Sequence, residues 1–327
     1  MEAQTNLDRL PNQALDELLE NALKGNRRSL SRLISKVEND RNTAKETIKR
    51  LFSQTGKAIV VGVTGPPGSG KSSLIAALAM HLSSADTKVA VVAIDPSSIF
   101  SGGALLGDRI RMKELSEDPN VFIRSMATRG SGGGLCRAAA DVVRVLDAAS
   151  WSYVMVETAG AGQTDLDIVE LAQTVVVVLS PGWGDEIQAF KAGLMEIGDI
   201  FVVNKSDVEG ADRTLLDIRG MLLTYGSERE WKPPVLLTNS IKRSGIRELA
   251  AAIRDHQDYL SKTGSAKGAL TNGETQLLAA IRQELELEFI PELRRAPAFV
   301  AYGEKVATRQ LDPYTAAASL IRDLMRR

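Results

Sequence analysis

Residues suited to phosphate chemistry occur in Gly65-Pro66-Pro67-Gly68-Ser69-Gly70-Lys71-Ser72. This segment matches the pattern G-x-x-x-x-G-K-[ST], and it follows an apolar run and precedes a helical pattern, as the pattern requires. Glycines let backbone N–H groups surround a phosphate without obstruction, and the helix that starts near Lys71 adds its positive end. Lys71 supplies charge to the β- and γ-phosphates, and the Ser72 hydroxyl suits Mg²⁺. We expect this segment and Ser73 to bind a nucleotide, the alternative being a chance glycine turn.

A second segment suited to ligand recognition is Asn204-Lys205-Ser206-Asp207, at the end of the apolar run DIFVVN. A carboxylate accepts two hydrogen bonds side by side, and guanine offers N1–H and its 2-amino group, whereas adenine offers an unpaired acceptor at N1. Asp207 therefore predicts a site that binds guanine in preference to adenine, and we expect Asn204 and Lys205 to stabilise the loop around it. After the last predicted strand comes Thr238-Asn239-Ser240-Ile241-Lys242. We expect this loop, and in particular Ser240, Ile241 and Lys242, to offer backbone amides to the guanine carbonyl. The alternative is a polar helix start that Asp207 caps.

Three carboxylates stand near the ends of other predicted strands. Glu157 opens Glu157-Thr158-Ala159-Gly160, where many P-loop GTPases carry D-x-x-G, so Glu157 could hold Mg²⁺ and Gly160 could bind the γ-phosphate. Asp95 ends a strand, and Asp108 lies ahead of a helix. The alternatives are that Asp95 and Asp108 cap helices and that Glu157 is a solvated strand end.

The elements that must position these residues alternate between apolar strands and helices. Seven apolar runs, rich in β-branched residues, are predicted as strands: 58–64, 88–95, 121–125, 153–158, 174–179, 199–204 and 234–239. The helical patterns are 71–84, 108–116, 134–149, 187–197, 211–225 and 244–260. Continuous apolar strands that alternate with helices indicate a parallel sheet covered on both faces. We predict an α/β fold, a doubly wound and mostly parallel P-loop domain over residues 57–260.

The flanking segments are predicted to be helical. Residues 1–56 carry three helical stripes and form an N-terminal extension. In the C-terminal segment 261–327, a small, polar linker (261–271) precedes an amphipathic helix over 273–290, which we expect Pro291 and Pro297 to break, and a last helix follows at 313–327.

The composition excludes several classes of protein. The chain has 40 basic and 41 acidic residues, and this balance argues against a dedicated nucleic-acid binder. One cysteine excludes an internal disulfide, and the two histidines, His81 and His256, are too few for a typical zinc or nickel site. We expect both histidines on the surface of helices. No apolar run approaches the roughly 18 residues of a membrane span, and the N-terminus lacks a signal-peptide pattern, so we expect a cytoplasmic protein.

Three longer motifs carry a family resemblance. The runs D-P-S-S-x-x-x-G-G-x-x-L-G-D-x-x-R-M (95–112), E-T-x-G-x-G-Q (157–163) and P-G-x-G-D-E-x-Q-x-x-K-x-G-x-M-E-I-x-D (181–199) occur in this order. The chain resembles the MeaB/ArgK family of P-loop GTPases, which are chaperones of adenosylcobalamin-dependent acyl-CoA mutases. The sequence departs from the family pattern at Ala159, Ala161 and Trp183, which leaves the client mutase open.

The resemblance implies a set of roles and partners. Ser72, Asp95, Asp108 and Glu157 would surround Mg²⁺, and Lys191, in a mobile switch over 181–193, would swing toward the nucleotide when the partner docks. Lys71, Lys191 and Glu157 would be the catalytic residues. The implied function is GTP hydrolysis that gates adenosylcobalamin loading and protects a mutase of the methylmalonyl-CoA type. The implied partners are that mutase, the adenosyltransferase that delivers cobalamin, and a second copy bound through the C-terminal helices.

Two other functions remain open at this point. One is a kinase that uses the P-loop to phosphorylate a protein or a small molecule, although we find no acceptor pocket or base. The other is a nickel- or cobalt-insertion GTPase, which would carry Cys and His motifs that this chain lacks.

Overall fold

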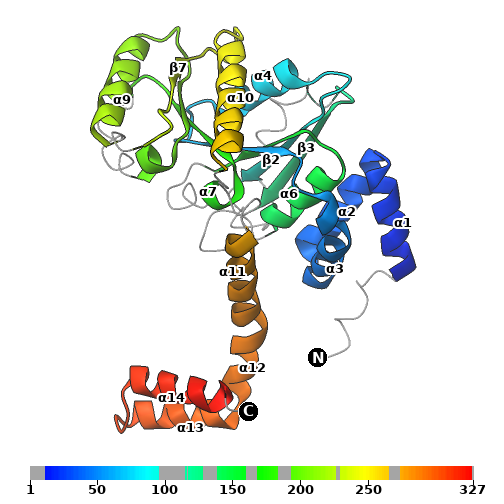
Figure 1. Ribbon diagram of the computed structural model, residues 1–327, viewed down its shortest axis with the longest axis vertical. Helices are drawn as coiled ribbons and strands as arrows, with labels where there is room; N and C mark the ends of the chain where they lie inside the picture. Colours follow the sequence, from blue (N-terminus) through cyan, green and yellow to red (C-terminus); the bar gives the residue numbers. More distant parts are fainter. Residues whose placement is uncertain are drawn as a thin grey trace. The chain divides into compact units, whose positions relative to one another are not determined.

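Figure 1 shows the computed structural model of the chain. It describes residues 12–95, 115, 117–127, 138–159, 168–182, 193–225, 229–264 and 273–325. The chain divides into two compact units, Met1–Thr271 and Asn272–Arg327. The first unit contains the sheet and both nucleotide motifs.

The described strands of the first unit form one seven-stranded sheet. They are β1 Ile59–Thr64, β2 Val89–Asp95, β3 Val121–Ala127, β4 Tyr153–Glu157, β5 Thr174–Leu179, β6 Ile200–Val203 and β7 Val235–Leu237. Their order is β3-β2-β4-β1-β5-β6-β7, and every adjacent pair is parallel. The predicted doubly wound parallel sheet is therefore confirmed.

Helices cover both faces of this sheet, which explains why the strands are apolar on both sides. Along β1, Val60 belongs to one hydrophobic cluster, and Val61 and Val63 belong to the other. Helices α4 (Lys71–Leu82) and α10 (Ile246–Thr263) pack on the face of Val61. The opposite face is covered by α6 (Ala139–Ala148), α7 (Ile168–Leu171) and α9 (Ala211–Tyr225), as Figure 1 shows for α4, α10 and α6.

The N-terminal helices share a core with the sheet. They are α1 Asn12–Leu23, α2 Arg27–Asn39 and α3 Arg41–Leu51, followed by a 3₁₀ turn, η1 Phe52–Gln54. Their buried leucines join the same cluster as α6. The Asp147 carboxylate on α6 accepts the backbone N–H groups of residues 56–58 at 2.5, 3.1 and 2.9 Å. These bonds fix the chain where the helical segment leads into β1.

The second unit is helical. It comprises α11 Gly273–Glu284, a π-helical turn at Leu285–Phe289, α12 Ile290–Arg295, α13 Pro297–Ala307 and α14 Pro313–Met325. The expectation that Pro291 breaks the first of these helices is wrong. Pro291 lies in the first turn of α12, where its missing N–H is tolerated, and the π-helical turn precedes it. Across the described residues, no helix is both long and apolar enough to cross a bilayer.

Candidate nucleotide-binding site

The two nucleotide motifs meet at the carboxyl edge of the sheet. In a parallel sheet all strands end at the same edge, and ligands bind in the crevice there. Glu157, at the end of β4, is in register with Val63 of β1. The phosphate-loop segment follows β1, and the Asn204 segment follows β6. Strand β5 separates them, so the fold brings both to one edge.

The phosphate loop, residues 65–70, requires glycine at two positions. Gly65 has a φ of +138°, and a Cβ there would lie 2.1 Å from the Val178 carbonyl oxygen. Gly70 has a φ of +93°, and a Cβ would lie 2.4 Å from the Asn204 Nδ2 atom. The Ser69 hydroxyl is fully buried and has no hydrogen-bond partner among the described residues. A buried unpaired hydroxyl is costly, so this loop fits an additional oxygen-rich ligand.

Lys71 opens α4 with a nearly buried side chain. Its ammonium donates to the carbonyl oxygens of Gly65, at 2.8 Å, and Pro66, at 3.2 Å. These contacts fold the lysine back over the phosphate loop. The positive charge and the N-terminal end of α4 therefore face the same space, which makes this space suitable for an anion.

Ser72 and Glu157 form a pair of oxygen groups beside this loop. The Ser72 hydroxyl donates to Glu157 Oε1 at 2.7 Å, and both residues are buried. Hydroxyl and carboxylate oxygens are the ligands that Mg²⁺ prefers, so the residues present fit this ion. Thr158 continues the strand, because its N–H donates to the Val63 carbonyl and its hydroxyl to that of Thr64.

Asn204 connects the phosphate loop to both loops of the predicted base site. Its Nδ2 donates to the Ser69 carbonyl at 3.1 Å. Its Oδ1 accepts the Ser240 hydroxyl at 2.8 Å, the Ser240 N–H at 3.2 Å and the Thr238 hydroxyl at 3.2 Å. One buried amide therefore holds three segments of chain that lie far apart in the sequence.

Lys205 makes a second connection between the Asn204 segment and the phosphate loop, and it lies at a sharp bend of the chain. Its φ is +57°, a left-handed conformation that is strained for a residue with a side chain and is frequent at functional sites. Its ammonium donates to the Gly68 carbonyl at 2.7 Å. The lysine thus lies across the exposed part of the phosphate loop.

Asp207 presents a half-exposed carboxylate at this edge. Lys242 Nζ lies 3.3 Å from Asp207 Oδ2. The backbone N–H of Asp207 itself and the nearby Lys242 ammonium favour the charged form and lower the pKa of Asp207 below its usual 3.8. The carboxylate is therefore ionised at neutral pH, which is the form that accepts two hydrogen bonds from guanine.

The structure gives side-chain roles to two residues of a segment for which the sequence predicted only backbone amides. Thr238 bonds to Asn204, and Asn239 Oδ1 accepts the Lys242 N–H at 2.9 Å. Both are buried. The signal that could have found them is the polar run Thr-Asn-Ser directly after the last strand. Asn239 bonds within its own loop, whereas the partner of Thr238 is 34 residues away in the sequence. Ile241, by contrast, exposes 90% of its surface.

Several predicted site residues lie outside the described residues. They are Asp108, Gly160 and Lys191. For Asp95 the structure describes the backbone at the end of β2, and the side chain is outside the description. The predicted residues that the structure does bring together are the phosphate loop with Lys71 and Ser72, Glu157, and the loops of Asn204 and Ser240. Ser73 lies half-buried in the first turn of α4.

Comparison with known proteins assigns a family to this arrangement. A family model described as methylmalonyl-CoA mutase-associated GTPase MeaB matches residues 30–290. The chain belongs to the MeaB family. This span contains the phosphate loop and both loops of the predicted base site. Membership of the family supports GTP hydrolysis and guanine-nucleotide binding at a general level.

Relatives of this MeaB-family chain cover most of its length. It is 44% identical over 314 residues to a Pyrococcus abyssi protein named as a GTPase, covering 95% of this chain and 97% of that protein. It is 32% identical to GTPase ArgK of Escherichia coli, covering 85% of this chain and 86% of that protein. A solved structure of a LAO/AO transport system kinase has the same fold, with a TM-score of 0.69, 24% identity and coverage of 97% and 99%.

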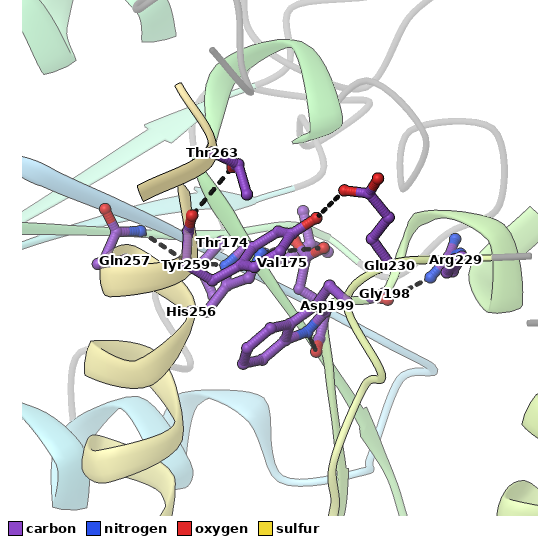
Figure 2. A network of polar contacts seen from close by, with 11 residues as sticks. Thr174, Val175, Gly198, Asp199, Arg229, Glu230, His256, Gln257, Tyr259 and Thr263 are labelled. Atoms are coloured by element: carbon purple, nitrogen blue, oxygen red, sulfur yellow. Dashed lines mark hydrogen bonds and ion pairs between the residues drawn. The ribbon is translucent and has the colours of Figure 1, made fainter. Parts of the chain in front are cut away.

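A second polar cluster of this MeaB-family chain lies at the opposite, amino edge of the sheet (Figure 2). Thr174 begins β5, and Asp199 immediately precedes β6. The prediction that His256 lies on the surface is wrong, because its side chain is only 1% exposed. His256 Nδ1 lies 2.9 Å from the Thr174 hydroxyl, and its Nε2 lies 3.6 Å from Asp199 Oδ1. The polar residue faces inward because these partners satisfy it there.

The order Asp199–His256–Thr174 is similar to the order of a nucleophilic triad, but the environment argues for a structural role. Thr174 is fully buried, and its hydroxyl accepts a hydrogen bond from Gln257 at 2.7 Å. Trp231 covers His256, with ring centroids 4.8 Å apart, and donates its indole N–H to the Asp199 carbonyl at 2.8 Å. A substrate has no access to this hydroxyl, so the cluster fixes α10 to the sheet.

Proposed function

We propose that this chain binds GTP with Mg²⁺, hydrolyses it to GDP and phosphate, and uses the nucleotide state to gate adenosylcobalamin loading of an acyl-CoA mutase. The observation that carries the nucleotide part is the hydrogen bonding of Asn204. Its amide joins the loop suited to phosphates to the loops suited to guanine, so both ends of one ligand would be bound by one rigid network.

In this proposal the phosphate end is bound by the chain's positive groups. Phosphoryl transfer depends mainly on positioning and on neutralising charge. Lys71 would exchange its bonds to the Gly65 and Pro66 carbonyls for bonds to phosphate oxygens. The backbone N–H groups of residues 65–70 and the start of α4 would contribute further positive charge. Asp207 would accept the N1–H and 2-amino groups of guanine.

Mg²⁺ would be held by Ser72 and Glu157, with Asp95 and Asp108 as further oxygen groups. When bound, the ion would neutralise charge on the β- and γ-phosphates. Because Ser72 donates to Glu157 in the present arrangement, the hydroxyl would have to turn its lone pairs toward the ion. Glu157 would keep the hydroxyl in position during that change.

The proposed client is an adenosylcobalamin-dependent mutase of the methylmalonyl-CoA type, in the cytoplasm. The description of the matching family model supports this proposal, as does a 31% identical relative over 268 residues, the mouse methylmalonic aciduria type A homolog. Lys191 and its neighbours would respond to the docked mutase and complete the catalytic site. The adenosyltransferase that delivers cobalamin would be a second partner.

We further propose that the C-terminal helices bind a second copy. Helix α11 has no buried residue, and its apolar side chains form a stripe at helical spacing. Leu277 and Ile281 of α11, and Leu285 at the start of the π-helical turn, are 62%, 44% and 45% exposed. An exposed stripe of this kind is typical of an interface. Light scattering after size-exclusion chromatography would give a dimer mass, and Ile281→Glu would give a monomer mass.

One experiment separates hydrolysis from kinase activity. Purified protein receives GTP or ATP labelled at the γ-phosphate, with Mg²⁺, in the presence and absence of a cell extract depleted of nucleotides. We expect the label from GTP to appear as inorganic phosphate, and little release from ATP. Label transferred to a protein or a small molecule in the extract would instead support a P-loop kinase.

A second experiment tests the partner. Tagged protein is loaded with GTP, a non-hydrolysable GTP analogue or GDP and then mixed with a purified adenosylcobalamin-dependent acyl-CoA mutase. We expect co-elution that depends on the nucleotide, and faster phosphate release when the mutase is present. Equal recovery without nucleotide, or no effect of the mutase on hydrolysis, would contradict the chaperone role and leave the GTPase activity standing.

A further inference from the structure

The hydroxyls of Thr64 and Thr158 meet where two neighbouring strands end, next to the phosphate loop. Thr64 is the last residue of β1 and precedes the phosphate loop, and Thr158 follows Glu157, the last residue of β4. The Thr158 hydroxyl donates to the Thr64 hydroxyl oxygen at 3.0 Å, and the Thr158 N–H donates to the Val63 carbonyl at 3.1 Å. Both threonines are buried. The pairing of β1 with β4 therefore continues for one residue beyond the end of β4.

The packing of the core does not require hydroxyls at these two positions. Val63 and Glu157 are opposite each other in the register of β1 and β4, so Thr64 and Thr158 form the next cross-strand pair. Valine has nearly the shape of threonine, and replacing both partners of a buried hydrogen bond by apolar groups of the same shape can be neutral or stabilising. A hydroxyl pair that packing does not need indicates a directional role, which here is to hold two strand ends in one alignment.

These two strand ends carry the groups that the proposed magnesium site would use. The phosphate loop continues from the end of β1, and Glu157 ends β4. Glu157 is opposite Val63, which belongs to the hydrophobic cluster on the face of α4, and on this face Glu157 Oε1 accepts the Ser72 hydroxyl at 2.7 Å. Side chains alternate along a strand, so Thr158 points to the opposite face. From there Thr158 fixes the backbone from which the Glu157 carboxylate projects.

We propose that Thr158 is a positioning residue for Mg²⁺, which sets the distance between the Glu157 carboxylate and the phosphate loop through its bond to Thr64. This inference depends on the proposed binding of GTP with Mg²⁺ by Ser72 and Glu157. Residues that orient metal ligands from outside the ligand set commonly change metal affinity by about 10- to 100-fold. A small displacement of the end of β4 would therefore be sufficient to weaken the site.

Three substitutions separate positioning from a merely structural contact. Thr158→Val removes the donated hydroxyl and keeps the shape of the side chain. Thr158→Ser keeps the hydroxyl and should restore the behaviour of the unchanged chain. Thr174→Val serves as the matched control, because Thr174 is also a buried threonine of the sheet with a hydrogen-bonded hydroxyl, but it lies at the amino edge.

The readout is the affinity for a non-hydrolysable GTP analogue, measured by calorimetry once with Mg²⁺ and once with EDTA in its place. The ratio of the two affinities reports the magnesium site and does not depend on hydrolysis. We expect the unchanged chain, Thr158→Ser and Thr174→Val to bind the analogue about tenfold or more tightly with Mg²⁺ than with EDTA. Thr158→Val should lose most of this ratio, about tenfold, because a displaced Glu157 holds the ion less well. Its affinity in EDTA should stay close to that of the unchanged chain.

The outcomes distinguish this inference from the proposed function. If Thr158→Val keeps the full ratio, the threonine pair is only structural, and the inference is overturned. The same holds if Thr158→Ser loses as much of the ratio as Thr158→Val, or if Thr158→Val weakens both affinities equally together with a lower melting temperature. If the unchanged chain binds the analogue no better with Mg²⁺ than with EDTA, or does not bind it, the proposed function fails first.

Discussion

The two edges of the sheet carry polar clusters of similar composition and different character. At the amino edge, His256 lies 2.9 Å from the Thr174 hydroxyl and 3.6 Å from the Asp199 carboxylate, and Trp231 covers its ring. At the carboxyl edge, the buried Ser69 hydroxyl of the phosphate loop has no partner in the part of the chain that the structure describes, and Asp207 is half-exposed. The first cluster is complete within the chain, whereas the second leaves groups to be satisfied by a ligand.

This difference shows which buried polar groups indicate a ligand. Both edges contain an acid, a base and a hydroxyl, so residue types alone do not separate them. Backbone geometry does, because Gly65, Gly70 and Lys205 have positive φ values at the carboxyl edge. Strained or glycine-dependent backbone tends to occur where a ligand must approach. Four substitutions test this contrast, and their expected effects decrease from Lys71→Ala to Lys242→Met.

Lys71→Ala should have the largest effect, on catalysis. Removing the ammonium takes away the charge that the phosphates would face, so we expect GTP hydrolysis to fall about 1,000-fold. Phosphate release measures this, and circular dichroism verifies that the variant is folded. Lys57→Ala, an exposed lysine just before β1, is the matched control. Hydrolysis within threefold of the unchanged chain would remove Lys71 from the proposed mechanism.

Asp199→Ala should have its effect on stability. The substitution leaves the Val175 N–H without its 2.8 Å acceptor and leaves His256 without its carboxylate. We expect the free energy of unfolding to fall by about 3 kcal/mol, as measured with urea. Asp212→Ala, on the exposed face of α9, should change it little. Hydrolysis by the folded fraction should persist, and its selective loss would mean that the amino-edge cluster is catalytic.

Gly70→Ala should weaken nucleotide binding through the contact between the two motifs. The new Cβ would meet Asn204 Nδ2 at 2.4 Å and would displace the amide that joins them. We expect GTP affinity to fall about 30-fold, combining the clash with the cost of a positive φ. Gly68→Ala is the control, since its φ is +77° and nothing lies within 4 Å of its Cβ. Equal losses in the two variants would mean that strain alone acts.

Lys242→Met should have the smallest effect. The ion pair with Asp207 is largely solvent-exposed, so GTP affinity at physiological salt should fall less than about threefold. Lys242 contributes to the lowered pKa of Asp207, and its removal should bring that pKa back toward 3.8. Because the ionised carboxylate binds guanine, affinity would then begin to fall at a less acidic pH. A calorimetric pH series measures this, and an unchanged profile would contradict it.

The sequence was sufficient to predict the sheet and the loops at its carboxyl edge. Apolar runs fixed the strands closely, and β5 has its predicted limits, Thr174–Leu179. The phosphate loop and the Asn204 segment are local patterns, each readable within a few residues. The order of the strands then brings them together, which the parallel α/β class already implies.

What the sequence left open depends on contacts between distant segments. His256 has helical periodicity that suits either face of α10, and only its partners Thr174 and Asp199, more than 50 residues away, turn it inward. Thr238 has the composition of an ordinary turn residue, and its role follows from the bond that its hydroxyl donates to Asn204, 34 residues away. Pro291 predicts a helix end from sequence alone because the π-helical turn before it has no clear sequence pattern.

The central claim is that a single carboxylate, Asp207, identifies the base of the bound nucleotide. Its most direct test is the affinity of the unchanged chain and of Asp207→Asn for GTP, ATP and XTP, each with Mg²⁺. Xanthine has a carbonyl where guanine has its 2-amino group, so an amide at position 207 suits XTP. We predict that the unchanged chain prefers GTP and that Asp207→Asn prefers XTP. Binding of ATP as tightly as GTP, or an unchanged preference in the variant, would contradict the claim.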